Sequence, residues 1–340
     1  MIPAIFGLSG PTLTADERAF FREADPAGYI LFGRNCIDPQ QLRALTDDLR
    51  ALHGRDRLLV SIDQEGGRVA RLRPPLWSPY PPGEAFDRLY ALAPPSAIEA
   101  ARANAHAMGL ELAAMGITVD YHPPLDLRFA GMHDVVGDRS LGSDPMQVAA
   151  LGRAILEGLA AGGVAGCIKH MPGHGRAMVD SHKDMPLVHA SAQELEADLA
   201  PFRSLAHAPI GMTGHLMFPV WDAENPATLS AAIIRDVIRG RIGFDGLLLT
   251  DDIDMEALGG PIPERAARAQ AAGCDIVLNC WGRMDDMVGI CEALGPMSEV
   301  TAARLDRALA ATQVAPAIAP AHAELLAKRD ALLALEGQAA

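Results

Sequence analysis

Eight short apolar runs, separated by longer segments, constrain the fold more than any other feature of this sequence. Each run is continuously hydrophobic rather than hydrophobic at every second residue, which is typical of parallel strands buried on both faces. Parallel strands need long crossover connections, so strands and helices should alternate along the chain. The expected strands span residues 2–7, 28–33, 58–63, 117–122, 164–170, 209–215, 246–252 and 275–280.

Helix start and stop signals lie between these runs. Asp38 and Pro39 supply an N-cap and a first-turn proline, and leucines at helical spacing follow up to Gly54. Similar signals predict helices from Asp144-Pro145 to Gly162-Gly163, after the capping box Ser191–Glu194, and from Ser230 to Gly240. Eight strands that alternate with helices favour an α/β fold of the (β/α)8 TIM-barrel type, although periodicity alone leaves an open doubly wound sheet as the alternative.

The chain is long and apolar enough to form one large core. It has 340 residues, 49% of them hydrophobic, and no Pro/Ser/Gly-rich linker, charge block or low-complexity run divides it. Barrels commonly need ~250 residues or more as one unit. We therefore expect a single domain over residues 1–340, in which a C-terminal helical extension begins at about residue 296.

Charge and cysteine content limit the partners and the compartment. The formal net charge is −14, and the 29 Lys and Arg residues are scattered, which argues against nucleic acid or an anionic membrane as a partner. The five cysteines are odd in number and form no CxxC pair, so we expect free thiols in a reducing compartment. The N-terminus lacks the features of a signal peptide, and no apolar run approaches the ~20 residues that span a bilayer. We expect a cytoplasmic, monomeric protein.

The expected strands end in conspicuously polar residues. In an α/β barrel the reacting groups gather at the C-terminal ends of the strands. Burying carboxylates and imidazoles there is costly unless they react or bind a polar ligand, and a sugar is a natural ligand for such a pocket. The polar strand ends are Asp63, Asp120, His122, Lys169, His170, His215, Asp251 and Asp252, whereas Gly7 and Gly33 end the first two strands.

One loop carries the densest chemistry. Residues 169–175 contain two glycines and a proline, and Asp180 and His182 follow them. A carboxylate within reach of an imidazole fixes its tautomer and orientation, so Asp180 and His182 could form an acid/base dyad. By spacing alone, His170, His174 and His182 could instead bind zinc or be ordinary loop histidines.

The same loop, KHMPGHG followed by DSH, resembles the signature of the β-N-acetylglucosaminidases of glycoside hydrolase family 3. Further blocks agree in order, namely GYILFGRN near 28, IDQEGGRVARL at 62–72, GDRSLGSDP at 137–145, PATLS at 226–230 and GFDGLLLTDDIDMEAL at 243–258. The chain is similar to the compact single-domain bacterial members. These act in cytoplasmic peptidoglycan recycling and remove terminal N-acetylglucosamine from anhydro-muropeptides.

The resemblance implies roles for individual residues. Asp251, the first Asp of TDD, matches the nucleophile of a retaining mechanism, and the strand-end argument also expects a carboxylate there. His182, oriented by Asp180, matches the acid/base, which suits an imidazole because it titrates near neutral pH. The implied sugar subsite comprises Asp63, Arg71, Arg139, Lys169 and His170. His174 is expected to shape the loop, and no metal or cofactor is expected.

The sequence departs from the family pattern at a few positions. Met171 stands where Phe or Ile is expected, and Asp120 and His122 stand where a small amide and a small apolar residue are expected. His122 could be a core histidine or an extra substrate ligand. Trp281 follows the eighth strand, but a lone Trp more often packs than binds, so we leave it out of the site.

Four other functions remain as alternatives. A metal-dependent barrel hydrolase could draw its ligands from His122, His170, His174, His182, Asp63 and Asp251. A Schiff-base aldolase could use Lys169. A family 3 glycosidase could have β-glucosidase specificity, and a non-catalytic barrel could simply bind sugars.

Overall fold

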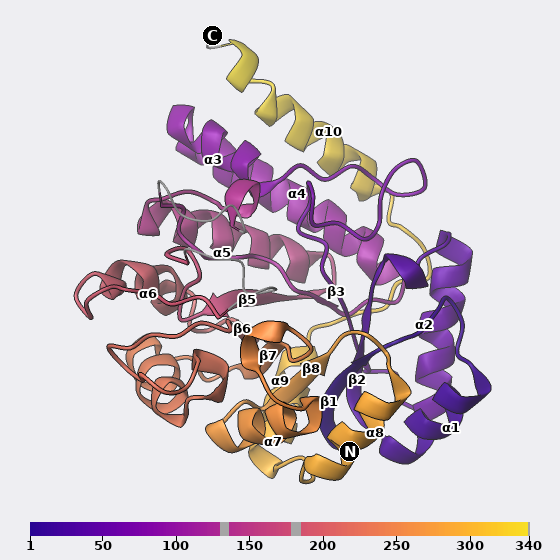
Figure 1. Cartoon of the computed structure of the whole chain (residues 1–340). Helices are drawn as coiled ribbons and strands as arrows, with labels where there is room; N and C mark the ends of the chain where they lie inside the picture. Colours follow the sequence, from indigo (N-terminus) through magenta and orange to yellow (C-terminus); the bar gives the residue numbers. More distant parts are fainter. Residues whose placement is uncertain (130–135, 178–184, 339–340) are drawn as a thin grey trace.

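The computed structural model describes residues 1–129, 136–177 and 185–338. Within them, eight parallel strands pair in sequence order and β8 closes onto β1 (Figure 1), which confirms the predicted barrel and excludes the open sheet. Each expected strand is present; β1 has the expected ends, and the ends of the other strands differ from the expected ones by up to two residues. The strands are β1 (Ile2–Gly7), β2 (Pro26–Leu31), β3 (Leu59–Ile62), β4 (Val119–Asp120), β5 (Ala165–Met171), β6 (Ile210–Thr213), β7 (Leu247–Asp252) and β8 (Ile276–Asn279).

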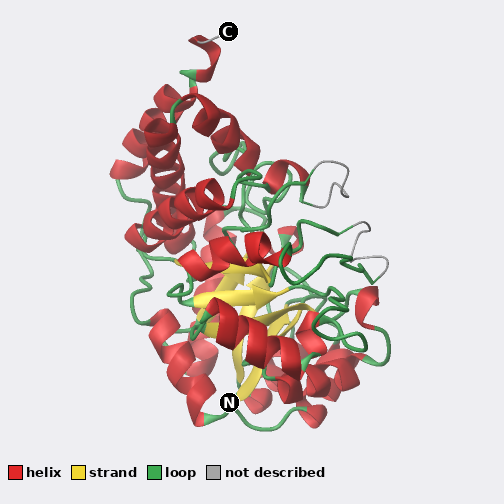
Figure 2. Cartoon of the chain, turned by 90° about the vertical axis from the view of Figure 1, so that its left-hand side faces the viewer, coloured by secondary structure: helices red, strands yellow, loops and turns green. Residues whose placement is uncertain are grey.

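Helices surround the strands (Figure 2). The α-helices are α1 (Ala15–Ala24), α2 (Pro39–His53), α3 (Gly83–Leu92), α4 (Pro94–Ala114), α5 (Pro145–Ala161), α6 (Leu195–Ser204), α7 (Ile262–Ala272), α8 (Met284–Ala293), α9 (Glu299–Leu309) and α10 (Ala321–Leu333). A π-helix, η4, spans Ile233–Ile242. Short 3₁₀ turns are η1 (Gly33–Asn35), η2 (Gly137–Arg139), η3 (Ala227–Leu229), η5 (Glu256–Leu258) and η6 (Glu336–Gln338).

The helix signals read from the sequence account for several boundaries. The Asp38 side chain accepts the Gln41 N–H at 2.8 Å, and Gly54 ends α2 in the left-handed conformation with φ 61°. The predicted α5 and the reciprocal bonds of the capping box before α6 are also present.

The predicted end of η4 at Gly240 is wrong, because the helix continues to Ile242 and is capped by Gly243 with φ 77°. Ile242 is buried in the core. Burial of a side chain of this size stabilises by about 2 kcal/mol, which exceeds the ~1 kcal/mol cost of a glycine inside a helix.

Strand residues alternate between two apolar layers. Phe6 and Leu31 belong to the layer that packs against the helices, together with residues such as Leu42 of α2. Ile30 and Met212 belong to the layer inside the barrel. Ile30, Met212 and Leu278 of this inner layer also line the cavity at the strand ends that is described below. The five cysteines, all within the described part of the chain, are free thiols as expected.

The last two α-helices lie in the segment expected to form the C-terminal extension. In Figure 1, α10 runs alongside α3 and α4, away from the strands. Arg329 of α10 is buried there and donates to Asn104 Oδ1 at 3.1 Å and to the Pro79 carbonyl at 2.9 Å. Among the helices of the described residues, we find none long and apolar enough to cross a membrane.

Candidate active site

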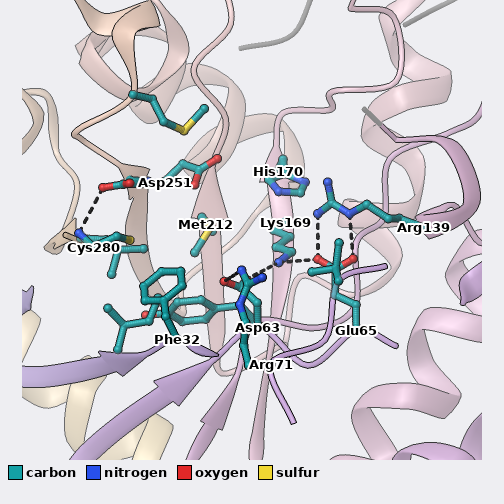
Figure 3. A pocket seen from close by; sticks show the side chains of 16 residues that line it. Phe32, Asp63, Glu65, Arg71, Arg139, Lys169, His170, Met212, Asp251 and Cys280 are labelled. Carbon is teal, nitrogen blue, oxygen red and sulfur yellow. Dashed lines mark hydrogen bonds and ion pairs between the residues drawn. The ribbon is translucent and has the colours of Figure 1, made fainter. Parts of the chain in front are cut away.

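A cavity of about 300 Å³ lies where the strands end. Asp63 lies directly after β3, Lys169 and His170 are in β5, and Asp251 and Asp252 are the last two residues of β7. Five of the eight polar strand-end residues predicted from the sequence therefore line one cavity, whereas Asp120, His122 and His215 do not. Figure 3 shows the charged side chains Glu65, Lys169 and Arg139 on one side of the cavity and Phe32 and Cys280 on the other.

Five side chains of this cavity form a chain of alternating charge, in the order Arg71, Asp63, Lys169, Glu65 and Arg139. Asp63 accepts from Arg71 Nη2 and from Lys169 Nζ, each at 3.0 Å. Glu65 lies 2.7 Å from Lys169 Nζ and accepts two bonds from Arg139, at 2.7 and 2.8 Å. Four members of this chain belong to the predicted sugar subsite, and Glu65 joins them.

In this row of alternating charges, each side chain is kept ionised by its oppositely charged neighbours, although all of them are largely buried. Burial alone would raise the pKa of Asp63, but Lys169 and Arg71 outweigh it and lower that pKa. Burial also opposes ionisation of Glu65, yet Arg139 and Lys169 bring its pKa well below the usual range. Burial would lower the pKa of Lys169, and the two carboxylates raise it instead. An amine held as ammonium cannot attack a carbonyl, which argues against the Schiff-base aldolase.

Local backbone geometry places Glu65. Its own N–H bonds the Val69 carbonyl at 2.9 Å, and Gly66 follows with φ 97°. A Cβ atom at Gly66 would lie 2.3 Å from the Pro81 carbonyl oxygen, so this turn requires glycine. The Gly-Gly of the DQEGG segment therefore turns Glu65 toward Lys169 and Arg139.

Asp251 lies at the end of β7 and does not belong to this row of alternating charges. Its Oδ1 accepts the Asp252 N–H at 2.8 Å. Burial would raise the pKa of Asp251, but His215, His170 and this hydrogen bond lower it below the ordinary value. The carboxylate is ionised at neutral pH, as a carboxylate nucleophile must be.

A strained residue of β5 faces the same cavity. His170 has φ 115°, and the pairing of β5 with β6 shifts register between Lys169 and Met171. Its Nδ1 lies 2.5 Å from Asp126 Oδ2, and Asp126 Oδ1 accepts the His174 N–H at 2.7 Å. Strain of this kind concentrates at functional sites, and here it aims the His170 ring into the cavity beside Asp251.

The family pattern described as Glycosyl hydrolase family 3 N terminal domain matches residues 8–313. The chain belongs to glycosyl hydrolase family 3. The predicted resemblance and the predicted glycoside hydrolase are thereby confirmed.

Relatives of this family 3 hydrolase have similar lengths. The β-hexosaminidase of Alkalilimnicola ehrlichii is 41% identical over 292 residues, which cover 82% of this chain and 80% of the relative. That of Bordetella pertussis is 38% identical over 285 residues, with 82% and 80% covered. NagZ from Neisseria gonorrhoeae, solved in complex with N-trifluoroacetyl-D-glucosamine, superposes with a TM-score of 0.88 at 32% identity and covers 98% of each chain.

The second acid of the TDD motif in this family 3 hydrolase differs from the first. Burial and the neighbouring Asp254 raise the pKa of Asp252 to about 8, so Asp252 is protonated at neutral pH. Asp252 Oδ1 accepts the N–H groups of Asp254 and Cys280, both at 3.2 Å. A protonated acid is a poor nucleophile, which favours Asp251 over Asp252 in that role.

This difference predicts a pH effect on stability. The Asp252 carboxyl stays protonated up to about pH 8 in the folded protein but ionises near pH ~3.9 when unfolded, so unfolding releases a proton between these values. Stability should therefore fall as pH rises from about 5 to 8. Asp252→Asn should remove part of this fall, measured as Tm against pH, whereas exposed Asp306→Asn should leave it unchanged. Parallel curves for wild type and Asp252→Asn would contradict the assignment.

Other expected residues lie elsewhere. Asp120 and His122 are buried and do not line the cavity; Asp120 Oδ1 accepts the Gln64 N–H at 2.9 Å. Burial raises the pKa of Asp120 well above its ordinary value. Burial lowers the pKa of His122 to about 4, so His122 is neutral at pH 7. Trp281, which the sequence analysis left out of the site, is 55% exposed and does not line the cavity. Asp180 and His182 lie outside the described residues.

The metal-dependent alternative finds little support in the parts of the chain that are described. Across residues 1–129, 136–177 and 185–338, no group of three or more His, Cys, Asp and Glu side chains is placed to hold a metal ion. His170 is engaged by Asp126. The proposed ligand His182 lies outside these ranges.

The sequence analysis did not identify two residues of the site, Glu65 and Asp126. The position of each residue in the sequence could have indicated its place in the site. Glu65 follows Asp63 by two residues in DQEGG, and Asp126 closes the run VDYHPPLD just beyond β4. Active sites of barrels are built from the loops that follow the strands, so acidic residues soon after β3 and β4 were candidates.

Proposed function

We propose that this family 3 hydrolase removes terminal, non-reducing β-linked N-acetylglucosamine from peptidoglycan fragments, namely N-acetylglucosaminyl-anhydro-N-acetylmuramic acid muropeptides. The observation that carries the proposal is one ionised carboxylate, Asp251, facing a cavity whose other side alternates donors and acceptors. Sugar hydroxyls both donate and accept hydrogen bonds, so the alternating charged side chains from Arg71 to Arg139 can satisfy them. A cavity of about 300 Å³ is at the small end of ligand pockets and suits one sugar residue.

The comparisons support the N-acetyl sugar. Several relatives are named β-hexosaminidases, and the Neisseria enzyme was solved with an N-acylated glucosamine. The β-N-acetylglucosaminidase of Thermotoga maritima shares the fold as well, with a TM-score of 0.76 at 27% identity, covering 93% of this chain and 68% of its own. We further propose that the protein acts as a cytoplasmic monomer, without nucleic-acid or membrane partners.

The proposed mechanism has two steps. In the first, Asp251 attacks the anomeric carbon while His182, held by Asp180, protonates the departing glycosidic oxygen. In the second, neutral His182 takes a proton from water, and the hydroxide oxygen displaces Asp251 from the anomeric carbon. Two inversions give net retention. Asp63, Arg71, Arg139, Lys169 and His170 hold the sugar during both steps.

The mechanism is tested by trapping the glycosyl enzyme. A 5-fluoro N-acetylglucosaminyl fluoride should label the peptide that contains Asp251, as identified by mass spectrometry after proteolysis. A parallel panel of 4-nitrophenyl β-glycosides should show faster hydrolysis of the N-acetylglucosaminide than of the glucoside. A label on another peptide would refute the nucleophile, a faster glucoside would favour β-glucosidase specificity, and loss of activity with EDTA restored by zinc would favour the metal enzyme.

A further inference from the structure

Glu65 occupies a position that an anionic ligand would otherwise take. Its side chain is 4% exposed, and its two oxygens accept the Nε and Nη2 groups of Arg139 while Oε1 also meets Lys169 Nζ. A guanidinium fork beside an ammonium is the arrangement that binds a carboxylate or phosphate group. The Glu65 carboxylate is thus the anion that Arg139 and Lys169 bind, in place of an anion from a ligand.

The consequence for a ligand depends on its charge. A sugar hydroxyl can donate to a carboxylate oxygen and accept from a nearby cation, so it fits an alternating chain of charges. The carboxylate of a uronic acid can only accept, and in this cavity it would lie against Glu65 and Asp63, two carboxylates held ionised by their neighbours. Placing like charges together in a buried site is a recognised means of rejecting a wrong ligand.

We propose that Glu65 is a specificity-determining residue that excludes anionic sugars, such as uronic acids, from the site of this hydrolase. The inference rests on the proposed function in taking the cavity as the sugar site. Glu65 pairs with Lys169 and Arg139 so that both can donate to a neutral sugar without attracting a competing anion. Its removal converts the site into one that prefers an anion.

The experiment measures binding of D-glucuronic acid and N-acetylglucosamine by isothermal titration calorimetry. Wild-type protein should bind N-acetylglucosamine and bind glucuronic acid far more weakly. Glu65→Gln should gain about tenfold or more in affinity for glucuronic acid, because a charge-assisted pair with Lys169 and Arg139 replaces a repulsion. Glu65→Ala also frees the volume of the side chain, so its gain should be larger. Affinity for N-acetylglucosamine should fall in both variants.

The matched control is a carboxylate that likewise pairs with two cationic side chains but lies away from the cavity. Asp245 precedes β7, at the opposite end of the barrel, and bonds Arg304 and Arg307. Asp245→Asn makes the same change in charge, and its ratio of affinities for the two sugars should equal that of wild type. Combining Glu65→Gln with Lys169→Met should cancel much of the gain, since one of the two cations is then absent.

The outcomes separate the two proposals. Folded Glu65 variants, verified by circular dichroism, that show no gain for glucuronic acid would overturn the role of Glu65 even if wild type hydrolyses N-acetylglucosaminides. Wild type that binds glucuronic acid as well as N-acetylglucosamine would also overturn it. Wild type that cleaves no N-acetylglucosaminide, together with Glu65 variants that gain the anion, would refute the proposed function and leave the anion exclusion standing.

Discussion

Asp251→Ala is expected to lower kcat for an aryl β-N-acetylglucosaminide by about 10⁴-fold or more, with the fold intact. The physical reason is that Asp251 is the ionised carboxylate of β7 that faces the cavity, whereas Asp252 beside it holds its proton up to about pH 8. Asp252 therefore cannot take over the attack on the anomeric carbon. The measurement is steady-state turnover at neutral pH, with circular dichroism to verify the fold.

Rescue of Asp251→Ala by added azide would test the same prediction through the appearance of a product rather than through a loss of activity. In Asp251→Ala a small anion can enter the vacated space and attack the anomeric carbon from the same face as the carboxylate. The product would be the α-glycosyl azide, since only one inversion occurs, and nuclear magnetic resonance can assign its configuration. Asp252→Asn serves as the control and should keep far more of its turnover. Near-wild-type turnover of Asp251→Ala, or a larger loss in Asp252→Asn, would move the nucleophile to Asp252.

The barrel could be predicted because its determinants are local. Continuous apolar runs such as the one before Asp251 are required of any strand covered on both sides, and the caps at Asp38 and Gly54 depend on neighbouring residues alone. The end of η4 could not be predicted in this way. It depends on whether Ile242 is buried by the rest of the molecule, which no local signal reports.

The site was predictable to the extent that strand ends define it. Asp63, Lys169, His170 and Asp251 follow from the rule that barrel strands point their C-terminal ends at one pocket. The pairing between Asp126 and His170 does not follow from it, because the two are 44 residues apart and meet only through a positive φ and a register shift in β5. These are consequences of tertiary packing rather than of sequence periodicity.

For Asp120 and His122, the strand-end rule gave the wrong prediction, because neither residue lines the cavity. Both are in or next to β4, which is only two residues long, and both are buried without lining the cavity. Tyr121, which lies between them, belongs to the inner apolar layer and lines the cavity. Successive side chains of an extended segment point to opposite faces, so Asp120 and His122 point away from the cavity. The face on which a side chain lies, and not only its place at a strand end, decides whether the residue belongs to the site.

His182→Ala is expected to slow hydrolysis in a way that depends on the leaving group. A general acid contributes most where the departing oxygen is basic, so the loss should reach about 10²- to 10⁴-fold for a poor leaving group such as a methyl glycoside or a disaccharide. For 2,4-dinitrophenyl β-N-acetylglucosaminide, whose leaving group needs no proton, formation of the glycosyl enzyme should be nearly as fast as in wild type. The measurement is kcat/KM across a series of aryl glycosides of increasing phenol pKa.

The second step supplies the independent readout. Because His182 would also deprotonate the attacking water, its removal should make the glycosyl enzyme on Asp251 accumulate with the activated substrate, seen as a burst of phenol and as a mass increase on the protein. Azide should then release a β-glycosyl azide, the product of two inversions, which distinguishes this variant from Asp251→Ala. The exposed His189 provides the control, since His189→Ala alters a histidine a few residues further along the chain. An equal loss on good and poor leaving groups would remove His182 as the acid, and the His170 imidazole, held by Asp126 in the same cavity, would be the next group to test.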